Sequence, residues 1–245
     1  MWLTWWSSRP SDSDALIASH GGWTAIGFAV IVGIIVVETG LPVRARAADN
    51  GRDIALNGNG RGAHACSSCH GTEGEGRPQA GYPRLAALSS NYIERQLKDF
   101  ADKSRDNDLM HPIAKSLSPS EIQTVAGYYA SLTAPKAEEP KPLNDGDIAL
   151  GKALADNGNW SSGLPACGQC HGPSGQGVGK SFPRLAGQGY SYLLNQLKAW
   201  KSGNRSNDPL NLMTGVVSKL DDKQMNAVAA YFASLPTTPQ PGGKP

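Results

Sequence analysis

The sequence CSSCHG at residues 66–71 is answered by CGQCHG at residues 167–172. These two stretches contain all four cysteines of the 245-residue chain, as two tight pairs and not as the scattered residues of a disulfide framework. Cys-x-x-Cys-His is the attachment signature of haem c. The pattern therefore predicts two covalently bound haem c groups, held through thioether bonds to Cys66, Cys69, Cys167 and Cys170.

The spacing within each stretch has a geometric reason. Residues i, i+3 and i+4 share one face of a short helix, so two thiols can bond one haem while the adjacent imidazole binds its iron. We therefore expect His70 and His171 to be axial ligands. The alternatives are a zinc site, which needs four ligands where each stretch offers three, and a redox dithiol, which needs a βαβ context absent here.

The chain after residue 48 repeats itself at an offset that grows from 100 to 103 residues. PRLA at 83–86 recurs at 183–186, and QLK at 96–98 recurs at 196–198, with apolar residues at helical spacing around these matches. Such self-similarity is typical of a repeated structural unit. We expect an all-α fold with two tandem helical domains, at residues 49–133 and 147–236.

The segments outside the two domains differ in composition. Residues 134–146 hold three prolines and five charges without periodicity, which indicates a stiff, solvated linker. Residues 237–245 are rich in proline and glycine and predict a disordered tail.

Within the domains, Ser118 and Asp221 stand just before the last helix of each repeat, where a short polar side chain caps a helix.

The second axial ligand of each iron is expected from the methionines. Met110 and Met213 occupy matching repeat positions just before the last helix of each domain. Histidine and methionine together raise the reduction potential and leave no open position on iron, which argues against catalysis there. Met225 lies in the apolar phase of its helix and is expected in the core. His111, beside Met110, is a competing candidate ligand.

Residues around the haem can be suggested from the repeat. A ligating histidine usually donates its other N–H to an acceptor that fixes the ring. Pro83 and Pro183 are candidates to offer that carbonyl, although both also read as ordinary turn prolines. Arg84 and Arg184 are candidates to pair with haem propionates, the alternative being exposed arginines. The glycines that follow each histidine predict close chain passage at the haem edge.

The first 48 residues predict a membrane-directed segment. Residues 15–37 carry no formal charge and are expected to form an apolar helix long enough to approach a bilayer span, although the densest part has the length of a signal-peptide core. Ala45-Arg46-Ala47 offers a small-x-small cleavage pattern. A cleaved signal peptide and a retained N-terminal anchor both remain open, and the second gives possible membrane attachment through residues 15–37.

Net charge excludes one class of partner. A formal charge of +2 is too mild for a dedicated nucleic-acid binder, so we expect no nucleic acid among the partners.

The two domains differ in charge. Residues 49–133 hold nine Lys and Arg against ten Asp and Glu, while residues 147–236 hold eight against five. The resulting −1 and +3 could orient docking of a redox partner at low salt, or be an incidental surface difference.

The two CxxCHG units, the PRLA segments, QLKDF and QLKAW, and the endings AGYYASL and AAYFASL resemble the dihaem class I c-type cytochromes, most closely the cytochrome c4 family. The resemblance covers residues from about 50 to 236. It implies two tandem class I cytochrome c domains about a pseudo-twofold axis, with haems close enough for electron exchange. It also implies the contact of each Pro83 or Pro183 carbonyl with the ligating histidine.

The resemblance further implies an electron carrier of a periplasmic respiratory chain. Its donor would be a quinol-oxidising complex or a dehydrogenase and its acceptor a terminal oxidase, with the protein soluble or tethered to the outer face of the inner membrane. The alternative is a dihaem electron-transfer subunit of a membrane oxidase or dehydrogenase complex. An enzyme, either a dihaem peroxidase or a thiosulfate-oxidising cytochrome, is disfavoured, because the haem motifs use every cysteine and the expected ligands fill both axial positions.

Overall fold

The computed structural model describes residues 43–135 and 144–237. Over these residues the chain is helical, with isolated bridges but no strands, as the sequence predicts. Both repeats belong to one compact unit. The apolar helix expected at residues 15–37 lies outside the described part, and none of the helices inside that part is long and apolar enough to cross a membrane.

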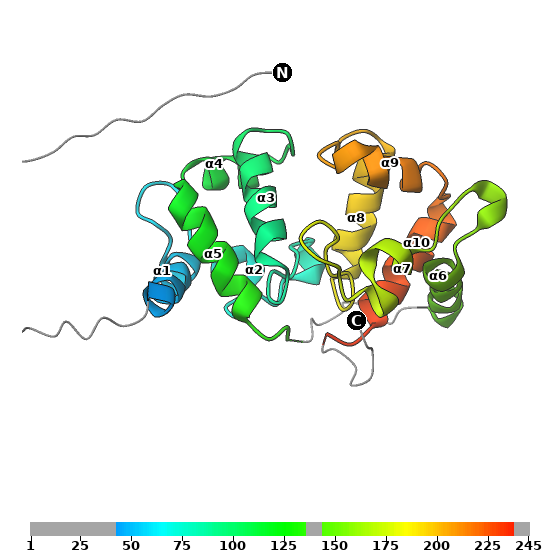
Figure 1. Cartoon of the computed structure of the whole chain (residues 1–245), viewed down its shortest axis with the longest axis horizontal. Helices are drawn as coiled ribbons and strands as arrows, with labels where there is room; N and C mark the ends of the chain where they lie inside the picture. Colours follow the sequence, from blue (N-terminus) through cyan, green and yellow to red (C-terminus); the bar gives the residue numbers. More distant parts are fainter. Residues whose placement is uncertain (1–42, 136–143, 238–245) are drawn as a thin grey trace, which may run out of the picture. The chain divides into compact units, whose positions relative to one another are not determined.

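The N-terminal module is built around two helix pairs. Helix α1 packs across α5, and α3 packs against α4 and α5 (Figure 1). Side chains from α1, α3 and α5 form its buried core, which includes Phe100 and Tyr129. The elements in order are α1 (Val43–Asn57), α2 (Ser67–His70), the 3₁₀ turn η1 (Pro78–Ala80), α3 (Ser90–Ala101), α4 (Met110–Lys115) and α5 (Pro119–Ser131).

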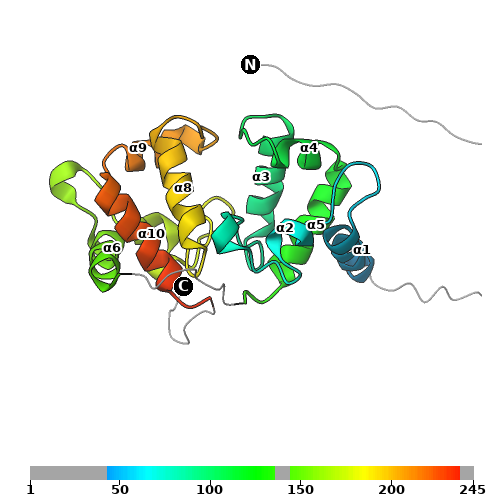
Figure 2. The same cartoon turned by 180° about the vertical axis from the view of Figure 1, so that it is seen from behind.

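The C-terminal module repeats this arrangement. Its first helix α6 packs across its last helix α10, and α8 packs against α9 and α10 (Figure 2). Met225 on α10 is 1% exposed within the core, which confirms the prediction for it. The elements are α6 (Asp145–Asn157), η2 (Trp160–Ser162), α7 (Cys167–His171), η3 (Pro173–Gly175), α8 (Tyr190–Lys201), η4 (Pro209–Asn211), α9 (Leu212–Val217) and α10 (Asp222–Ser234).

Glycines bring the first and last helices of each module into close contact. A β-carbon added to Gly51 on α1 would overlap the backbone carbonyl of Thr124 on α5. A β-carbon on Gly151 of α6 would overlap the carbonyl of Ala227 on α10 in the same way. Both crossings therefore depend on the missing side chain.

Ordered residues extend beyond the expected module boundaries 49–133 and 147–236. Helix α1 begins at Val43, inside the segment 1–48 that was expected to be leader. Ala134, expected in the solvated linker 134–146, is buried against the first module. Helix α6 begins at Asp145, because the side chain of Asn144 accepts hydrogen bonds from the first backbone N–H groups of that helix.

The expected disordered tail begins one residue too early. Thr237 belongs to the described part of the chain, and its carbonyl accepts a hydrogen bond from the Arg184 side chain. Residues 238–245 lie outside the described part. The hydrogen bond from the Arg184 side chain therefore holds Thr237, beyond the last helix, against the second module.

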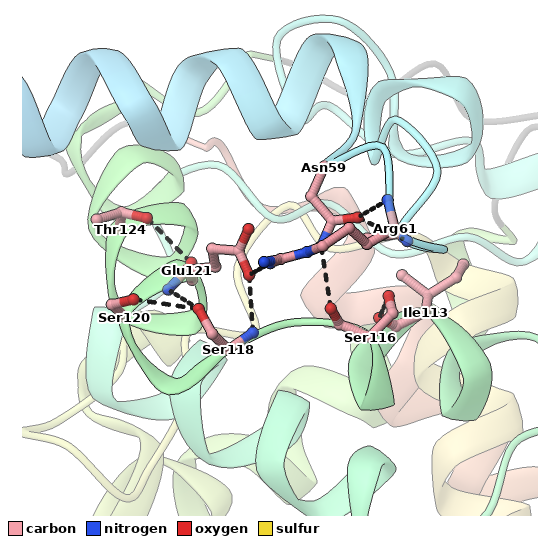
Figure 3. Close-up of polar contacts among 9 residues, drawn as sticks. Asn59, Arg61, Ile113, Ser116, Ser118, Ser120, Glu121 and Thr124 are labelled. Atoms are coloured by element: carbon pink, nitrogen blue, oxygen red, sulfur yellow. Dashed lines mark hydrogen bonds and ion pairs between the residues drawn. The ribbon is translucent and has the colours of Figure 1, made fainter.

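Helix α5 begins with a capping box (Figure 3). The Ser118 hydroxyl accepts from the Glu121 backbone N–H, and the Glu121 carboxylate accepts from the Ser118 backbone N–H at 2.8 Å. Arg61, from the loop after α1, pairs with the same carboxylate, and Asn59 donates to the Ser116 carbonyl. Asp221 and Gln224 form the equivalent box on α10, so both predicted caps are confirmed.

We expect Ser118→Ala to lower the free energy of unfolding by about 1 kcal/mol at neutral pH, because the Glu121 backbone N–H in the first turn of α5 loses its side-chain acceptor. Ser131→Ala, at the exposed end of the same helix, is the control. The backbone hydrogen bond from Ser118 holds the pKa of Glu121 below its usual value. The stabilisation from ionised Glu121 is therefore present above its usual pKa and is lost as pH falls through the folded-state value.

Chemical denaturation at pH 7 and in acid measures both effects. If Ser118→Ala cost no more than Ser131→Ala at pH 7, the cap would contribute nothing to the stability of the first module.

Candidate haem sites

The C-terminal module gathers its predicted haem residues around one cavity. Cys167, Cys170 and His171 lie on α7, and Met213 lies on α9. All four line a cavity of about 400 Å³ whose other walls include the core residues Leu197, Val228 and Phe232. The structure thus brings the expected attachment and ligand residues of this module together.

The N-terminal module has the corresponding residues in the same places. Cys66 stands at the N-cap of α2, and His70 ends that helix in a buried position. Met110 opens α4, and both Met110 and Cys66 pack against the core of the module. The repeat seen in the sequence is therefore also a repeat in structure.

Each histidine is oriented by a proline carbonyl. His70 Nδ1 lies 2.9 Å from the carbonyl oxygen of Pro83, and His171 Nδ1 lies 2.8 Å from that of Pro183. A proton on Nδ1 leaves Nε2 as the nitrogen free to bind a metal. Burial lowers the pKa of both imidazoles, which favours the neutral form that ligates iron.

Glycines allow the proline segment to reach the histidine. The backbone N–H of Gly76 donates to the His70 carbonyl at 2.8 Å, and Gly76 has a φ of +85°. A β-carbon there would lie 2.6 Å from the Arg84 backbone nitrogen. The left-handed conformation and the close chain passage both require glycine, and Gly177 repeats them with a φ of +86°. This agrees with the close passage predicted from the sequence.

The thiols do not have the properties of a reactive dithiol. Burial raises the pKa of Cys66, and it raises the pKa of Cys167 to about 11. Redox-active and zinc-binding cysteines work as thiolates and have lowered pKa values. Cys66 and Cys167 therefore lack the lowered pKa of a redox-active dithiol.

Several buried N–H groups near the haem sites have no partner among the described residues. They are Nε and Nη1 of Arg84, Nε of Arg184 and Nε1 of Trp200. Burial and the nearby charge of Arg184 lower the pKa of Arg84 to about 10. Buried donors of this kind normally face an acceptor. Haem carboxylates are acceptors with the right charge, so the residues present fit a haem with its propionates directed here.

Arg84 is not an exposed arginine, which was the alternative interpretation of it. Its side chain is 1% exposed, and its Nη2 donates to the carbonyl of Ala186 in the second module. Gln188 accepts from the Arg84 backbone N–H at 2.8 Å and donates to the Arg84 carbonyl at 3.0 Å. Arg84 therefore also joins the two modules.

His111, considered as a competing ligand, also has its ring oriented by a backbone carbonyl, which leaves its Nε2 free as at His70. Its Nδ1 lies 2.8 Å from the carbonyl oxygen of Phe100 on α3. Its repeat counterpart Thr214 instead hydrogen-bonds Asp208. His64 is an exposed loop residue.

The two modules meet through a polar network that the sequence analysis did not assign. Arg105 donates to Gln96 of its own module and to Gln196 of the other, at 2.7 Å each. Arg205 donates to Gln196 at 2.6 Å and to Gln96 at 3.0 Å. Arg105 also reaches the Tyr192 hydroxyl at 3.1 Å. Both arginines are buried, so two like charges are held close together at this contact.

The cavity of the C-terminal module reaches this contact. Leu88, Tyr92, Arg95 and Gln96 from the first module form part of its wall. A haem in this cavity would therefore have residues of the other module at its edge.

The signal for the network was present in the repeat. Gln96 on α3 and Arg105 in the loop after it recur as Gln196 on α8 and Arg205 in the loop after that helix. Identity of buried polar residues between two copies indicates a shared contact. Gln188 gave no such signal, because Leu88 stands at the matching position.

Comparison with known proteins identifies the family. The family model for cytochrome c matches residues 148–236, and the model for subunit III of cbb3-type cytochrome c oxidase matches residues 54–128. A cytochrome c4 of Thiocapsa roseopersicina is 37% identical over 69% of this chain and 86% of its own length. The chain belongs to the dihaem class I cytochromes c of the cytochrome c4 type. This dihaem cytochrome carries two haem c groups and transfers electrons.

Other relatives of this cytochrome are named for a redox partner. The thiosulfate dehydrogenase electron acceptor of Thiomonas intermedia is 46% identical, covering 72% of this chain and 81% of the relative. The protein of the same name from Stutzerimonas stutzeri is 42% identical, covering 80% and 90%.

Solved structures agree with the dihaem fold. Reduced cytochrome c4 from Pseudomonas stutzeri has a TM-score of 0.67 at 29% identity, covering 77% of this chain and 98% of that one. The thiosulfate dehydrogenase TsdBA of Marichromatium purpuratum has a TM-score of 0.73 at 42% identity. That match covers 78% of this chain but only 40% of the TsdBA chain.

Proposed function

We propose that this dihaem cytochrome accepts electrons from a thiosulfate dehydrogenase and passes them to a terminal oxidase in the periplasm. The observation that carries the proposal is the pair of relatives, 46% and 42% identical over most of their length, that are named as electron acceptors of that enzyme. Their names favour a thiosulfate dehydrogenase as the electron donor, out of the broader class of quinol-oxidising complexes and dehydrogenases that the resemblance implies.

The proposed ligand set suits this role. His70 with Met110, and His171 with Met213, are proposed as the axial pairs of the two irons. The haems supply reversible one-electron chemistry when bound. The proline carbonyls hold each imidazole with its Nδ1 proton in place, at 2.9 and 2.8 Å, so that little rearrangement is needed between oxidation states.

The contact between the modules supports electron exchange within the molecule. The C-terminal cavity is walled in part by residues of the first module, including Tyr92 and Gln96. The Arg105 and Arg205 hydrogen bonds fix the two modules against each other. These contacts would hold two haem-binding modules in a fixed relation, which favours electron exchange between them.

The periplasmic location is proposed from the haem chemistry and the first 48 residues. Haem c attachment together with an apolar segment at 15–37 favours export, either as a soluble protein or as one tethered to the outer face of the inner membrane. The net charges of −1 and +3 on residues 49–133 and 147–236 are proposed to orient docking of redox partners.

A second candidate function follows from the TsdBA match. That chain contains a region similar to this cytochrome within a longer dehydrogenase chain. This favours the alternative that the present chain is an electron-transfer subunit bound stably to a dehydrogenase. Size-exclusion chromatography of the mixed proteins at physiological salt separates the two candidates, because only a stable subunit elutes with the enzyme.

Reduction by the proposed donor can be measured directly. We expect the oxidised cytochrome, mixed with a purified thiosulfate dehydrogenase and thiosulfate, to become reduced at a rate that increases with enzyme concentration. The rate should fall as salt is added, because charge steers the encounter. Haem absorbance follows the reaction.

Two controls define the result. Thiosulfate without the dehydrogenase should leave the cytochrome oxidised. Rapid reduction in that mixture would instead indicate that the cytochrome itself oxidises thiosulfate. A reaction no faster with the dehydrogenase than without it would remove that enzyme as donor.

A further inference from the structure

Trp200 has an indole N–H that nothing in the described chain accepts. The residue lies on α8, and its Nε1 is buried without a hydrogen-bond partner among residues 43–135 and 144–237. Trp200 lines the same cavity as His171 and Met213. Leaving a buried N–H unpaired costs free energy, so a partner inside the cavity is expected.

The first module lacks this donor. Phe100 stands at the matching repeat position on α3. Both rings carry an arginine over their face, with Arg105 4.5 Å from the Phe100 centroid and Arg205 4.0 Å from that of Trp200. Since phenylalanine already supports the stacked arginine, stacking does not explain why the second module has tryptophan. The N–H group is what distinguishes the two sites.

We propose that the Trp200 Nε1–H donates a hydrogen bond to a propionate of the haem in the C-terminal module, and that the two haem sites are chemically unequal for this reason. The inference rests on the two haem c groups and is independent of the electron donor proposed above.

The composition of the cavity wall favours a carboxylate as the acceptor. The charged side chains that line it are Arg95, Arg184, Arg205 and Asp208, and its titratable neighbours are Tyr92, Tyr192, His171 and the two attachment cysteines. Three of the four charges are cationic, and Nε of Arg184 is a second buried N–H for which the described part of the chain offers no acceptor. Cationic groups and unpaired donors around one space indicate that an anion occupies it.

A neutral donor has a defined effect on such an anion. It stabilises the ionised carboxylate without adding a charge, so it lowers the pKa of that propionate. With Trp200 present, the propionate stays ionised across the neutral range and the reduction potential of its haem changes little with pH. Without the N–H, the propionate pKa rises into that range. The potential then falls as pH increases, because a newly ionised propionate stabilises ferric iron.

Trp200→Phe tests the proposal, because it removes the N–H and leaves a ring for Arg205 to stack on. Voltammetry of the holoprotein from pH 5 to 9 should show the C-terminal haem gaining a pH-dependent potential while the other haem keeps its profile. Met110→His assigns the waves, since it moves that of the N-terminal haem. Trp160→Phe is the matched control, because Trp160 lies in the same module with 69% exposure.

A measurement on the unsubstituted protein does not depend on how a variant folds. In proton–nitrogen NMR of the reduced holoprotein, the Trp200 indole N–H is expected to exchange with solvent far more slowly than that of Trp160. Rapid exchange at Trp200 would overturn the proposal. So would a Trp200→Phe protein in which the C-terminal wave keeps the same pH profile as in the parent and in Trp160→Phe.

Discussion

Replacing Met213 with alanine is expected to lower the reduction potential of the C-terminal haem by on the order of 0.1 V, because axial ligands as a group set haem potentials over about 0.8 V. A thioether sulfur stabilises ferrous iron, and its loss favours the ferric state. Met213 lines the cavity with His171, which makes it the methionine available to that iron. The N-terminal haem, for which Met110 is the proposed ligand, should keep its potential.

Redox titration with visible spectroscopy measures this effect. Met225→Leu is the matched control, because Met225 is buried in the same module but does not line the cavity. Met213→His keeps a strong ligand at the site and distinguishes loss of ligation from loss of packing. An unchanged titration curve, with two histidine–methionine spectra still present in Met213→Ala, would contradict the assignment.

Gly51→Val is expected to destabilise the N-terminal module by about 3 kcal/mol, a typical cost of forcing atoms into a full core. Even a β-carbon at Gly51 would overlap the Thr124 carbonyl and approach the β-carbon of Tyr128 on α5. The neighbouring atoms are mostly backbone, so the contact can be relieved only by separating α1 from α5. Gly151→Val should have the corresponding effect on α6 and α10.

Gly127→Ala is the control for this prediction. Gly127 lies on α5 itself, and a β-carbon there would meet no atom within 4 Å. Alanine should therefore stabilise the module by about 0.5–1 kcal/mol through its helix propensity. Guanidinium unfolding of the holoproteins gives both values. Equal stability of Gly51→Val and the parent would mean that the helix crossing is not close.

The parts of the site that rest on local spacing could be predicted from the sequence. The Cys-x-x-Cys-His pattern places its groups on one helical turn wherever it folds, and the structure has that turn in both modules. The caps at Ser118 and Asp221 depend on residues three positions away. The proline carbonyls at Pro83 and Pro183 came from the family resemblance, and the structure has them within hydrogen-bond distance of the histidines.

The contact between the modules could not be predicted in the same way. Arg84 was expected near a propionate or in solvent, and its bond to Ala186 joins positions about 100 residues apart in sequence. The sequence predicts only that Trp200 is an apolar residue on a helix. Whether its indole N–H has a hydrogen-bond partner depends on the three-dimensional packing around it. The boundaries at Asp145 and Thr237 could not be predicted, because a helix cap and a tertiary hydrogen bond extend order into segments of loop-like composition.

Gln96 and Gln196 each accept hydrogen bonds from two arginines, and this sharing couples the evolution of the two repeats. Each amide oxygen serves a guanidinium from its own copy and one from the other copy. A half expressed alone would lose one of these bonds at its own arginine and at its own glutamine. Duplicated segments usually drift apart, yet here a change at either glutamine is felt in both copies, which restrains their divergence.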